Sequence, residues 1–369
     1  YDTFMNRKIP FQKIFWIGLM LFSMFFGAGN LIFAPFLGVQ AAGNTPLALF
    51  GFLCTSVVVP ILAIVILAKF KDGRSMLETI SKPLAIVFMS LVYLLIGPCI
   101  AIPRTATTSF EMFEWLIAPT ALNRMLFALV FFAASFFVAL HPNKLKDVLG
   151  KVMSPILLVL VGVVCVGSLV QPDAVSQIVV HYDQNPFGTG FVEGYQTMDI
   201  LAAFCFGSIM VMNIKNEGVE HKKAIHAVLV RAAIIAGVLL AGVYSLLAFS
   251  GMLRSETLLA ATNGAQVLSM LAEQLFGGFG QVINALIFLI ACFNVCTGLL
   301  SCVSEYFHEL VPRWSYRTWL IVFTVAGIVV SCFGLDVILS LSAPILNFLC
   351  PVAILFLVYG IFKKSDSQA

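Results

Sequence analysis

The feature that most constrains this chain is an apolar run, Ile14 to Val39, that is interrupted in its middle by Gly27, Gly29, Asn30 and, five residues further on, Pro35. The run exceeds the about 20 residues that a helix needs to cross a bilayer. Glycine costs about 1 kcal/mol in a helix interior, and proline costs about 3 kcal/mol. A membrane helix tolerates such an interruption only where the freed backbone groups face protein or a water-filled cavity.

Two interpretations fit this interruption. In the first, Gly27 and Ala28 let neighbouring helices approach closely, as small residues do in membrane proteins. In the second, the helix is discontinuous, and its open N–H and C=O groups bind a solute and an ion at mid-membrane. A plain membrane anchor gains nothing from either arrangement. Composition alone leaves both interpretations open.

The same stretch, Phe25 to Phe33, resembles the first-helix signature of the branched-chain amino acid:cation symporter family. Later stretches agree with that family in the same order: Ile96–Pro98, Ala101–Ala106, Glu193–Tyr195, Thr197–Asp199 and Phe206–Gly207. The resemblance covers nearly the whole chain, from residue 11 to about residue 363. It implies a leucine-transporter-like fold and transport of branched-chain amino acids energised by a cation gradient.

Composition independently indicates an integral membrane protein. Of the 369 residues, 60% are hydrophobic and only 11% are charged, whereas a soluble domain carries about 25% charged residues. We therefore expect a lipid bilayer and a small-molecule amino acid as partners, and no nucleic acid. The sequence does not indicate an oligomeric state.

The apolar segments predict ten membrane spans. They are residues 13–38, 46–69, 84–104, 123–141, 148–170, 195–214, 224–251, 275–304, 316–334 and 341–362. Of the 21 Lys and Arg residues, all but Arg104, Arg124 and Arg254 then fall on one side. By the positive-inside rule, that side and both termini are cytoplasmic.

Ten spans divide into two halves of five, and because five is odd the second half starts on the opposite side of the membrane from the first. Two such halves of similar make-up would form the inverted repeat of many secondary transporters. The predicted fold is all-α and polytopic, with ten transmembrane helices as a 5+5 inverted repeat and discontinuous helices 1 and 6. Its expected parts are a cytoplasmic N-terminus (1–12), a first five-helix repeat (13–170), an extracytoplasmic connection (171–194), a second repeat (195–362) and a cytoplasmic tail (363–369). The expected location is the bacterial cytoplasmic (inner) membrane.

A free amino acid is a zwitterion, so a mid-membrane site must satisfy a carboxylate, an ammonium group and a side chain. Broken helix ends supply N–H groups for a carboxylate and carbonyls for an ammonium or a sodium ion. The second break is expected in the sixth span at Phe204–Gly207, after Asp199. The predicted substrate-binding residues are Phe25, Phe26, Gly27, Ala28, Gly29, Asn30, Phe204, Cys205, Phe206 and Gly207.

The resemblance also implies a sodium ion between the first and eighth spans, as the coupling ion, and no covalent cofactor. Its expected ligands are the carbonyls of Ser23, Phe26 and Ala291 and the side chain of Asn294. The family usually carries two hydroxyl residues at the positions of Asn294 and Val295, and valine offers no oxygen. Three alternatives stay open: sodium bound through Asn294, sodium bound elsewhere, or a proton in its place.

Two charged residues are predicted gating or coupling residues, because charges inside a membrane are costly and indicate function. Asp199 either has such a role or caps the start of the sixth span, where a carboxylate is favourable. Arg104 either pairs with Glu111 or Asp199 as an outer gate, or extends its head group to the interface.

Other function classes have less support. A channel or sensor on the same scaffold is the alternative to a transporter, and concentrative uptake would separate the two. The sequence has no intramembrane Ser/His pair, HExxH-like pair or carboxylate cluster, so we expect no enzyme. The sequence has no phosphate-binding loop, and this disfavours an ATP-driven transporter. Cys292 and Cys296 share a helix face, but without a neighbouring His or carboxylate a metal pair is disfavoured.

Overall fold

A computed structural model describes residues 10–70, 72–172, 174–177 and 180–363, and these residues form helices and connections without a strand. The first half comprises α1 (Phe11–Phe25), α2 (Ala28–Ala41), η1 (Ala42–Asn44), α3 (Thr45–Leu53), η2 (Cys54–Val58), α4 (Val59–Leu67), α5 (Gly73–Glu78), α6 (Lys82–Leu94), η3 (Leu95–Cys99), α7 (Ala101–Glu111), α8 (Ala121–Ala139), η4 (Pro142–Lys144), η5 (Lys146–Met153) and α9 (Ser154–Val170). The second half comprises α10 (Val180–Gln184), α11 (Pro186–Glu193), η6 (Gly194–Thr197), α12 (Asp199–Asn216), α13 (Lys222–Met252), α14 (Ser255–Leu258), α15 (Gly264–Phe276), α16 (Gly278–Leu310), α17 (Tyr316–Ser331) and α18 (Leu335–Phe362).

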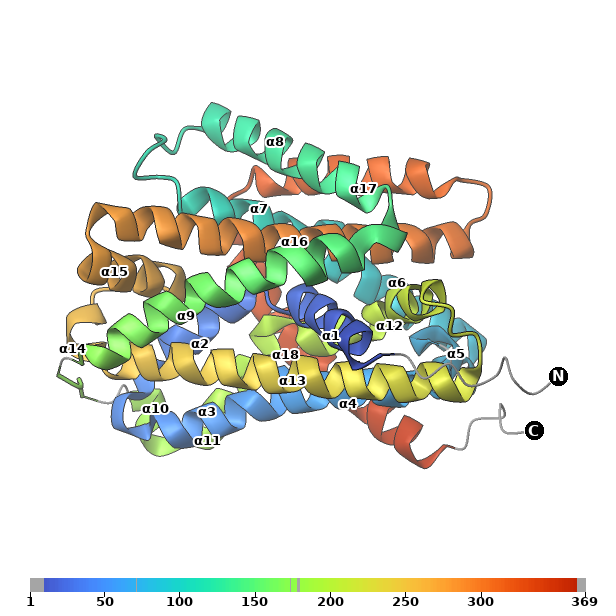
Figure 1. Cartoon of the computed structure of the whole chain (residues 1–369), viewed down its shortest axis with the longest axis horizontal. Coiled ribbons are helices and arrows are strands. Elements are labelled where there is room, and N and C mark those ends of the chain that lie inside the picture. Colours follow the sequence, from blue (N-terminus) through green and yellow to red (C-terminus); the bar gives the residue numbers. More distant parts are fainter. Residues whose placement is uncertain (1–9, 71, 173, 178–179, 364–369) are drawn as a thin grey trace.

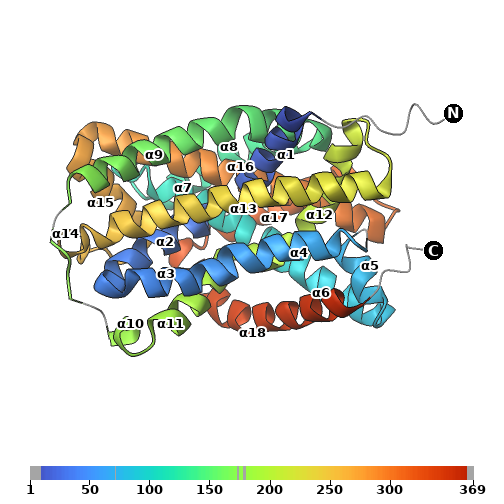
Figure 2. The ribbon, with the colours of Figure 1, turned by 60° about the horizontal axis from the view of Figure 1, so that its bottom comes forward.

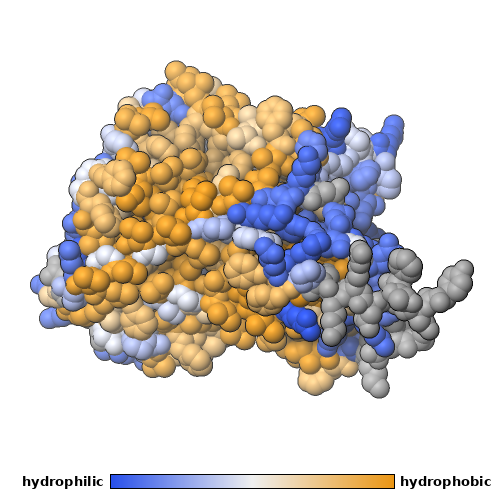
Figure 3. All heavy atoms as spheres, viewed as in Figure 1, coloured by the Kyte–Doolittle hydropathy of each residue, from blue (hydrophilic) through white to orange (hydrophobic). Residues whose placement is uncertain are grey.

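The long helices run side by side along the longest axis of the molecule (Figures 1 and 2). The described chain begins at Pro10 and ends at Lys363 at the same end of this bundle, which we call the terminal end. The short helices α10, α11, α14 and α15 lie at the opposite end (Figure 1). An apolar belt covers the middle of the face in view, and hydrophilic residues gather at the terminal end (Figure 3).

The described residues contain seven helices that are long and apolar enough to cross a membrane, or eight if the bent pair around Met198 is one span. Two shorter apolar helices, α1 and α17, are additional. The chain is therefore a multi-pass membrane protein. The finer prediction of ten spans in two inverted halves stays a prediction.

The predicted interruption of the first apolar run is present. Helix α1 ends at Phe25, Phe26 and Gly27 adopt extended backbone, and α2 begins at Ala28. The Asn30 side chain accepts a hydrogen bond from the Gly27 N–H at 2.9 Å, which satisfies one backbone group that the break frees. Asparagine three residues after the break thus stabilises the start of α2, as a polar side chain does at a helix end.

The prediction of the second break at Phe204–Gly207 is wrong. Helix α12 runs without interruption from Asp199 through these residues to Asn216. The break lies earlier, at Met198, whose φ of 67° is left-handed, and the helical segments on its two sides are bent by 41°. A single glycine such as Gly207 costs only about 1 kcal/mol inside a helix, which packing easily offsets.

A third irregularity lies in the segment Lys82–Glu111, where the sequence predicts a regular span. Gly97 is non-helical inside the π-helical turn η3, and Ile100 also departs from helical angles before α7 starts. A Cβ on Gly97 would lie 3.0 Å from Val303 Cγ2, so this turn packs tightly on α16. Helix α7 follows this turn directly, and all of its residues from Ala101 to Phe110, Arg104 among them, are buried.

Small residues do bring helices together, at Gly27 against α16 and at two further positions. Helix α13 packs along both α1 and α2 and so bridges the break. Gly38 of α2 lies directly against the Ala248 carbonyl, and Gly251 of α13 lies against the Pro35 carbonyl. Neither position has room for a Cβ. Close helix packing and the broken helix are therefore both present in the first apolar run, and they coincide at Gly27.

Candidate functional site

The two breaks meet at Gly29. A Cβ on Gly29 would lie 2.7 Å from Arg104 Nη2 and 3.2 Å from the Thr197 Cα, so only glycine allows this approach. Gly27 is in a similar position, because its Cβ would lie 2.5 Å from Val295 Cγ2 of α16. The backbone of the first break therefore contacts the second break, α7 and α16 at once.

A buried polar network links these elements beside the break. Asn30 Nδ2 donates to Asp199 Oδ2 at 2.7 Å and also contacts the Tyr244 hydroxyl. The Tyr244 hydroxyl donates to the same carboxylate oxygen at 3.3 Å. Asp199 begins α12, but its carboxylate thus accepts hydrogen bonds from α2 and α13. It connects three elements, which exceeds the role of a local helix cap.

Arg104 lies on the other side of Gly29. It is only 4% exposed, so its head group is buried and does not extend to an interface. Its Nη1 donates to the Gln196 carbonyl at 3.1 Å, and Gln196 Nε2 in turn donates to Asn347 of α18 at 3.1 Å. Within the described chain, no carboxylate lies at ion-pair distance from Arg104. The pairing of Arg104 with Asp199 that we considered from the sequence is therefore not formed.

A small cavity lies between these groups. Its lining comprises Met24, Phe25, Gly27, Ala28, Gly29, Asn30, Ile96, Ala101, Arg104, Thr105, Thr197, Met198, Asp199, Ala202, Phe206, Val295 and Leu299. Polar and charged side chains form part of the wall, and apolar side chains form the rest. The volume is about 20 Å³, and one water needs at least about 10–15 Å³. An amino acid therefore fits only after the surrounding helices move apart.

The predicted substrate-binding residues separate into two groups. Phe25, Gly27, Ala28, Gly29, Asn30 and Phe206 line the cavity. Phe26 instead stacks on Phe22 and Tyr244, with ring centroids 5.3 and 5.9 Å apart. Phe204 packs edge-on against Phe88 at 5.8 Å, and the Cys205 thiol contacts the Leu201 carbonyl of its own helix. A Cβ on Gly207 would meet nothing within 4 Å.

Two residues of the predicted sodium site, Ser23 of α1 and Asn294 of α16, contact each other through their side chains. Asn294 Nδ2 donates to Ser23 Oγ at 2.5 Å, and both residues are fully buried. Asn294 Oδ1 is buried and has no hydrogen-bond partner among the described residues. Such an orphaned acceptor is rare and needs an explanation. An oxygen of this kind is the ligand type that hard cations prefer, so the site fits the predicted ion.

Contacts between helices hold both ends of the bundle. At the opposite end, Gly264 of α15 lies directly against the Ile32 carbonyl of α2. At the terminal end, Glu217 at the end of α12 pairs with Lys13 of α1 and with Lys146 of η5. The first break is thus joined to α15 through α2, and to α12 and η5 through α1 and its neighbours.

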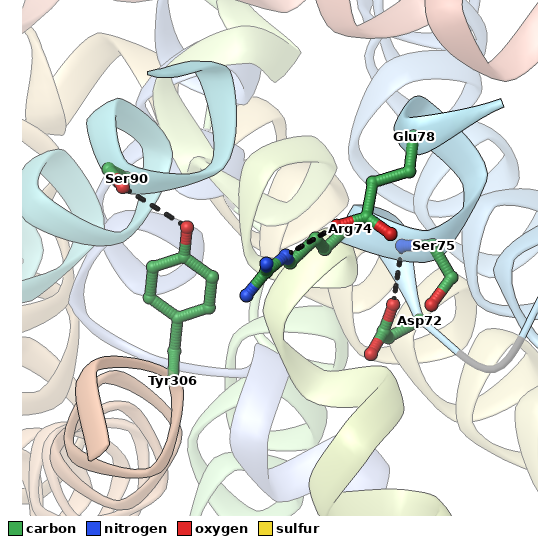
Figure 4. Close-up of polar contacts among 6 residues, drawn as sticks. All are labelled: Asp72, Arg74, Ser75, Glu78, Ser90 and Tyr306. Carbon is green, nitrogen blue, oxygen red and sulfur yellow. Dashed lines mark hydrogen bonds and ion pairs between the residues drawn. The ribbon is translucent and has the colours of Figure 1, made fainter. Parts of the chain in front are cut away.

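A second polar cluster lies between α5, α6 and α16 (Figure 4). The Asp72 carboxylate accepts from Ser75 N–H at 2.7 Å and caps α5. Arg74 binds Glu78 at 2.8 Å and extends toward Tyr306, whose hydroxyl lies 3.1 Å from Ser90 Oγ. The Tyr306–Ser90 contact therefore links α16 to α6, whereas the bonds of Asp72 and Arg74 stay within residues 72–78.

Sequence reasoning missed several lining or network residues. Tyr244 is the one tyrosine of the predicted span 224–251, and this was the available signal. Thr197 and Met198 lie in a stretch that carries the family resemblance, yet they were not assigned to the site. Val295 was noted only for its lack of oxygen, whereas it forms part of the cavity wall against Gly27.

Comparison with known proteins agrees with this architecture. The family described as branched-chain amino acid transport protein matches residues 11–368. The chain belongs to this family. The branched-chain amino acid permease BrnQ of Bacillus subtilis (strain 168) is 37% identical over 369 residues, covering 97% of this chain and 84% of its own. The permease BraB of the same strain is 34% identical over 365 residues, covering 98% and 82%. Members of the family are transport proteins and not enzymes, as expected.

A solved structure supports the fold at lower identity. The crystal structure of MhsT in complex with L-phenylalanine is 14% identical to this chain, with a TM-score of 0.52, and the match covers 94% of this chain and 98% of that one. At this identity the similarity concerns the fold alone. It agrees with the leucine-transporter-like fold that the sequence resemblance implied.

Proposed function

We propose that this chain is a secondary transporter that imports leucine, isoleucine and valine, and other apolar amino acids such as methionine. The observation that carries this proposal is the cavity at the meeting of two helix breaks. Its wall combines buried charged groups, Arg104 and Asp199, with apolar side chains such as Phe25 and Phe206. A free branched-chain amino acid has the same combination of charge and apolar surface.

The proposed coupling ion is sodium, bound between α1 and α16. The orphaned Asn294 Oδ1 next to Ser23 supports this choice, because a cation would supply the partner that the oxygen lacks. The carbonyls of Ser23, Phe26 and Ala291 are the further proposed ligands. Coupling requires that the bound amino acid raise the affinity for the ion, and that the ion raise the affinity for the amino acid equally.

The proposed mechanism is alternating access in the bacterial cytoplasmic membrane, with ten spans in two inverted halves and both termini in the cytoplasm. Spans 1, 2, 6 and 7 would move against spans 3, 4, 8 and 9. The small volume of the cavity supports this mechanism, because an amino acid fits only when the surrounding helices move apart. Opening of the α15 contact with α2 would admit substrate, and opening of the Glu217–Lys146 contact would release it.

The test is uptake of labelled leucine by proteoliposomes that contain the purified protein. An inward sodium gradient alone and an inward proton gradient alone are compared at matched membrane potential. Accumulation driven by sodium supports the proposal. Accumulation driven only by protons supports transport but assigns the coupling role to Asp199. Saturable binding of leucine without accumulation, or uptake that merely equilibrates, would indicate the sensor or the channel instead.

A further inference from the structure

Arg104 and Asp199 are buried ionisable groups that form no ion pair within the part of the chain that the structure describes. They are 4% and 2% exposed. Within the described chain, no carboxylate lies at ion-pair distance from Arg104, and no Lys, Arg or His lies at that distance from Asp199. A charge inside a membrane protein is costly and is normally paired. Two buried side chains of opposite charge that are held apart therefore indicate a ligand that binds between them and carries both charges.

Both groups face the same space. Arg104 and Asp199 line one cavity and lie near enough to interact electrostatically. Arginine has five N–H donors, and in the described structure one of them is engaged, by the Gln196 carbonyl. Its Nη2 lies beside Gly29. The Asp199 carboxylate is held beside the next residue, Asn30, so the two charges flank adjacent residues of the first break.

We propose that Arg104 binds the α-carboxylate of the transported amino acid and that Asp199 binds its α-ammonium group. The apolar part of the wall, including Phe25, Phe206 and Leu299, would then receive the side chain. This inference rests on the proposed function and deepens it. It replaces the outer-gate role for Arg104 with direct substrate recognition, and it gives the zwitterion side-chain ligands in addition to the broken backbone.

The arrangement implies a strict requirement for both charged ends. A ligand without the carboxylate leaves the buried Arg104 without an ionic partner. A ligand without the ammonium group leaves the buried Asp199 without one. A hydrogen bond to a charged group corresponds to about tenfold to hundredfold in affinity. Leucinamide, which lacks the carboxylate charge, and 4-methyl-2-oxopentanoate, which lacks the ammonium, should each bind at least about tenfold more weakly than leucine.

The test is competition against labelled leucine on the purified protein, with Arg104→Gln and Asp199→Asn. The measured quantity is the ratio of inhibition constants within each variant. In Arg104→Gln the preference for leucine over leucinamide should fall toward one, while the preference over 4-methyl-2-oxopentanoate persists. In Asp199→Asn the preference for leucine over 4-methyl-2-oxopentanoate should fall toward one, while the preference over leucinamide persists. A residue that only supports the fold would weaken all three ligands together and leave both ratios unchanged.

Two further variants keep the test sharp. Arg104→Lys retains the charge and should keep part of the preference for leucine over leucinamide. It can therefore be measured in place of Arg104→Gln if that variant binds leucine too weakly. Arg124→Gln is the matched control, because this arginine is 42% exposed and pairs with Glu114 outside the cavity. It should leave both ratios as in the wild type. Unchanged ratios in both site variants would overturn the inference while the proposed function stands. A wild-type protein that binds no apolar amino acid would overturn both.

Discussion

Asn294 of α16 and Ser23 of α1 face each other across the break, with the Asn294 amide nitrogen 2.5 Å from Ser23 Oγ. The other amide atom, Oδ1, is buried without a hydrogen-bond partner in the described structure. An unsatisfied acceptor costs about 1–3 kcal/mol when buried. A bound cation would remove this cost. Substitution of Asn294 is therefore the most direct test of whether the coupling ion binds here.

The first prediction concerns this pair. Asn294→Ala should raise the sodium concentration for half-maximal leucine uptake by about tenfold or more, because one oxygen ligand to a charged ion is lost. Saturating sodium should restore much of the uptake. Asn284→Ala is the matched control, since Asn284 is a buried asparagine of the same helix that contacts Met112 instead. An unaltered sodium dependence in Asn294→Ala would place the ion elsewhere.

The second prediction concerns Gly29. In Gly29→Ala the new methyl group would lie 2.7 Å from Arg104 Nη2 and 3.2 Å from Thr197 Cα, so the two breaks must separate. We expect leucine uptake to fall by at least about tenfold, because small misplacements at a site carry large penalties, and we expect Gly29→Leu to abolish it. Gly162→Ala in α9 is the control, because its Cβ would meet nothing within 4 Å. Normal uptake by Gly29→Leu would rule out the proposed role of this break.

The first break could be predicted from the sequence because its cause is local. Two glycines and an asparagine within an apolar run weaken the helix where they stand, and the Asn30 side chain satisfies the freed Gly27 N–H. The second break could not be located in this way. Met198 has no intrinsic preference for a left-handed conformation, which costs a non-glycine residue about 1–3 kcal/mol. The hydrogen bonds of Asp199 to Asn30 and Tyr244, which are remote in sequence, accompany that conformation.

In the candidate site, too, some features could be predicted from the sequence and others could not. Arg104 and Asp199 could be singled out, since charges in apolar spans are conspicuous. Their separation could not be predicted, because their hydrogen-bond partners, Gln196 for Arg104 and Asn30 and Tyr244 for Asp199, are remote from them in sequence or lie on other elements. Tyr244 was equally hard to assign, since a tyrosine in a long apolar helix also suits an interface with lipid.

The third prediction concerns Tyr244. Tyr244→Phe removes the hydroxyl that contacts Asn30 and Asp199 but keeps the ring, which stacks with Phe26 and packs edge-on against Phe52. The loss of a buried hydrogen bond to a charged group should lower the free energy of unfolding by about 1.5–3 kcal/mol. Leucine affinity should also fall, because Asp199 loses one of the groups that position it. Thermal unfolding and leucine binding measure the two effects. Tyr359→Phe, whose hydroxyl contacts Thr79 at an exposed position, should change neither.

The last prediction concerns the closure of the terminal end. Glu217, with a side chain only 10% exposed, pairs with Lys13 of α1 at 2.7 Å and with Lys146 of η5. Glu217→Gln removes the charge that both lysines share, so we expect a loss of about 1–2 kcal/mol, between the values for surface and buried pairs. Because the pairs hold α1 against α12, backbone hydrogen exchange should rise in α1 more than in α9. Glu114→Gln removes a more exposed pair with Arg124 at 3.8 Å and should leave exchange in α1 unchanged. Equal protection of α1 in both variants would mean that other contacts keep this end closed.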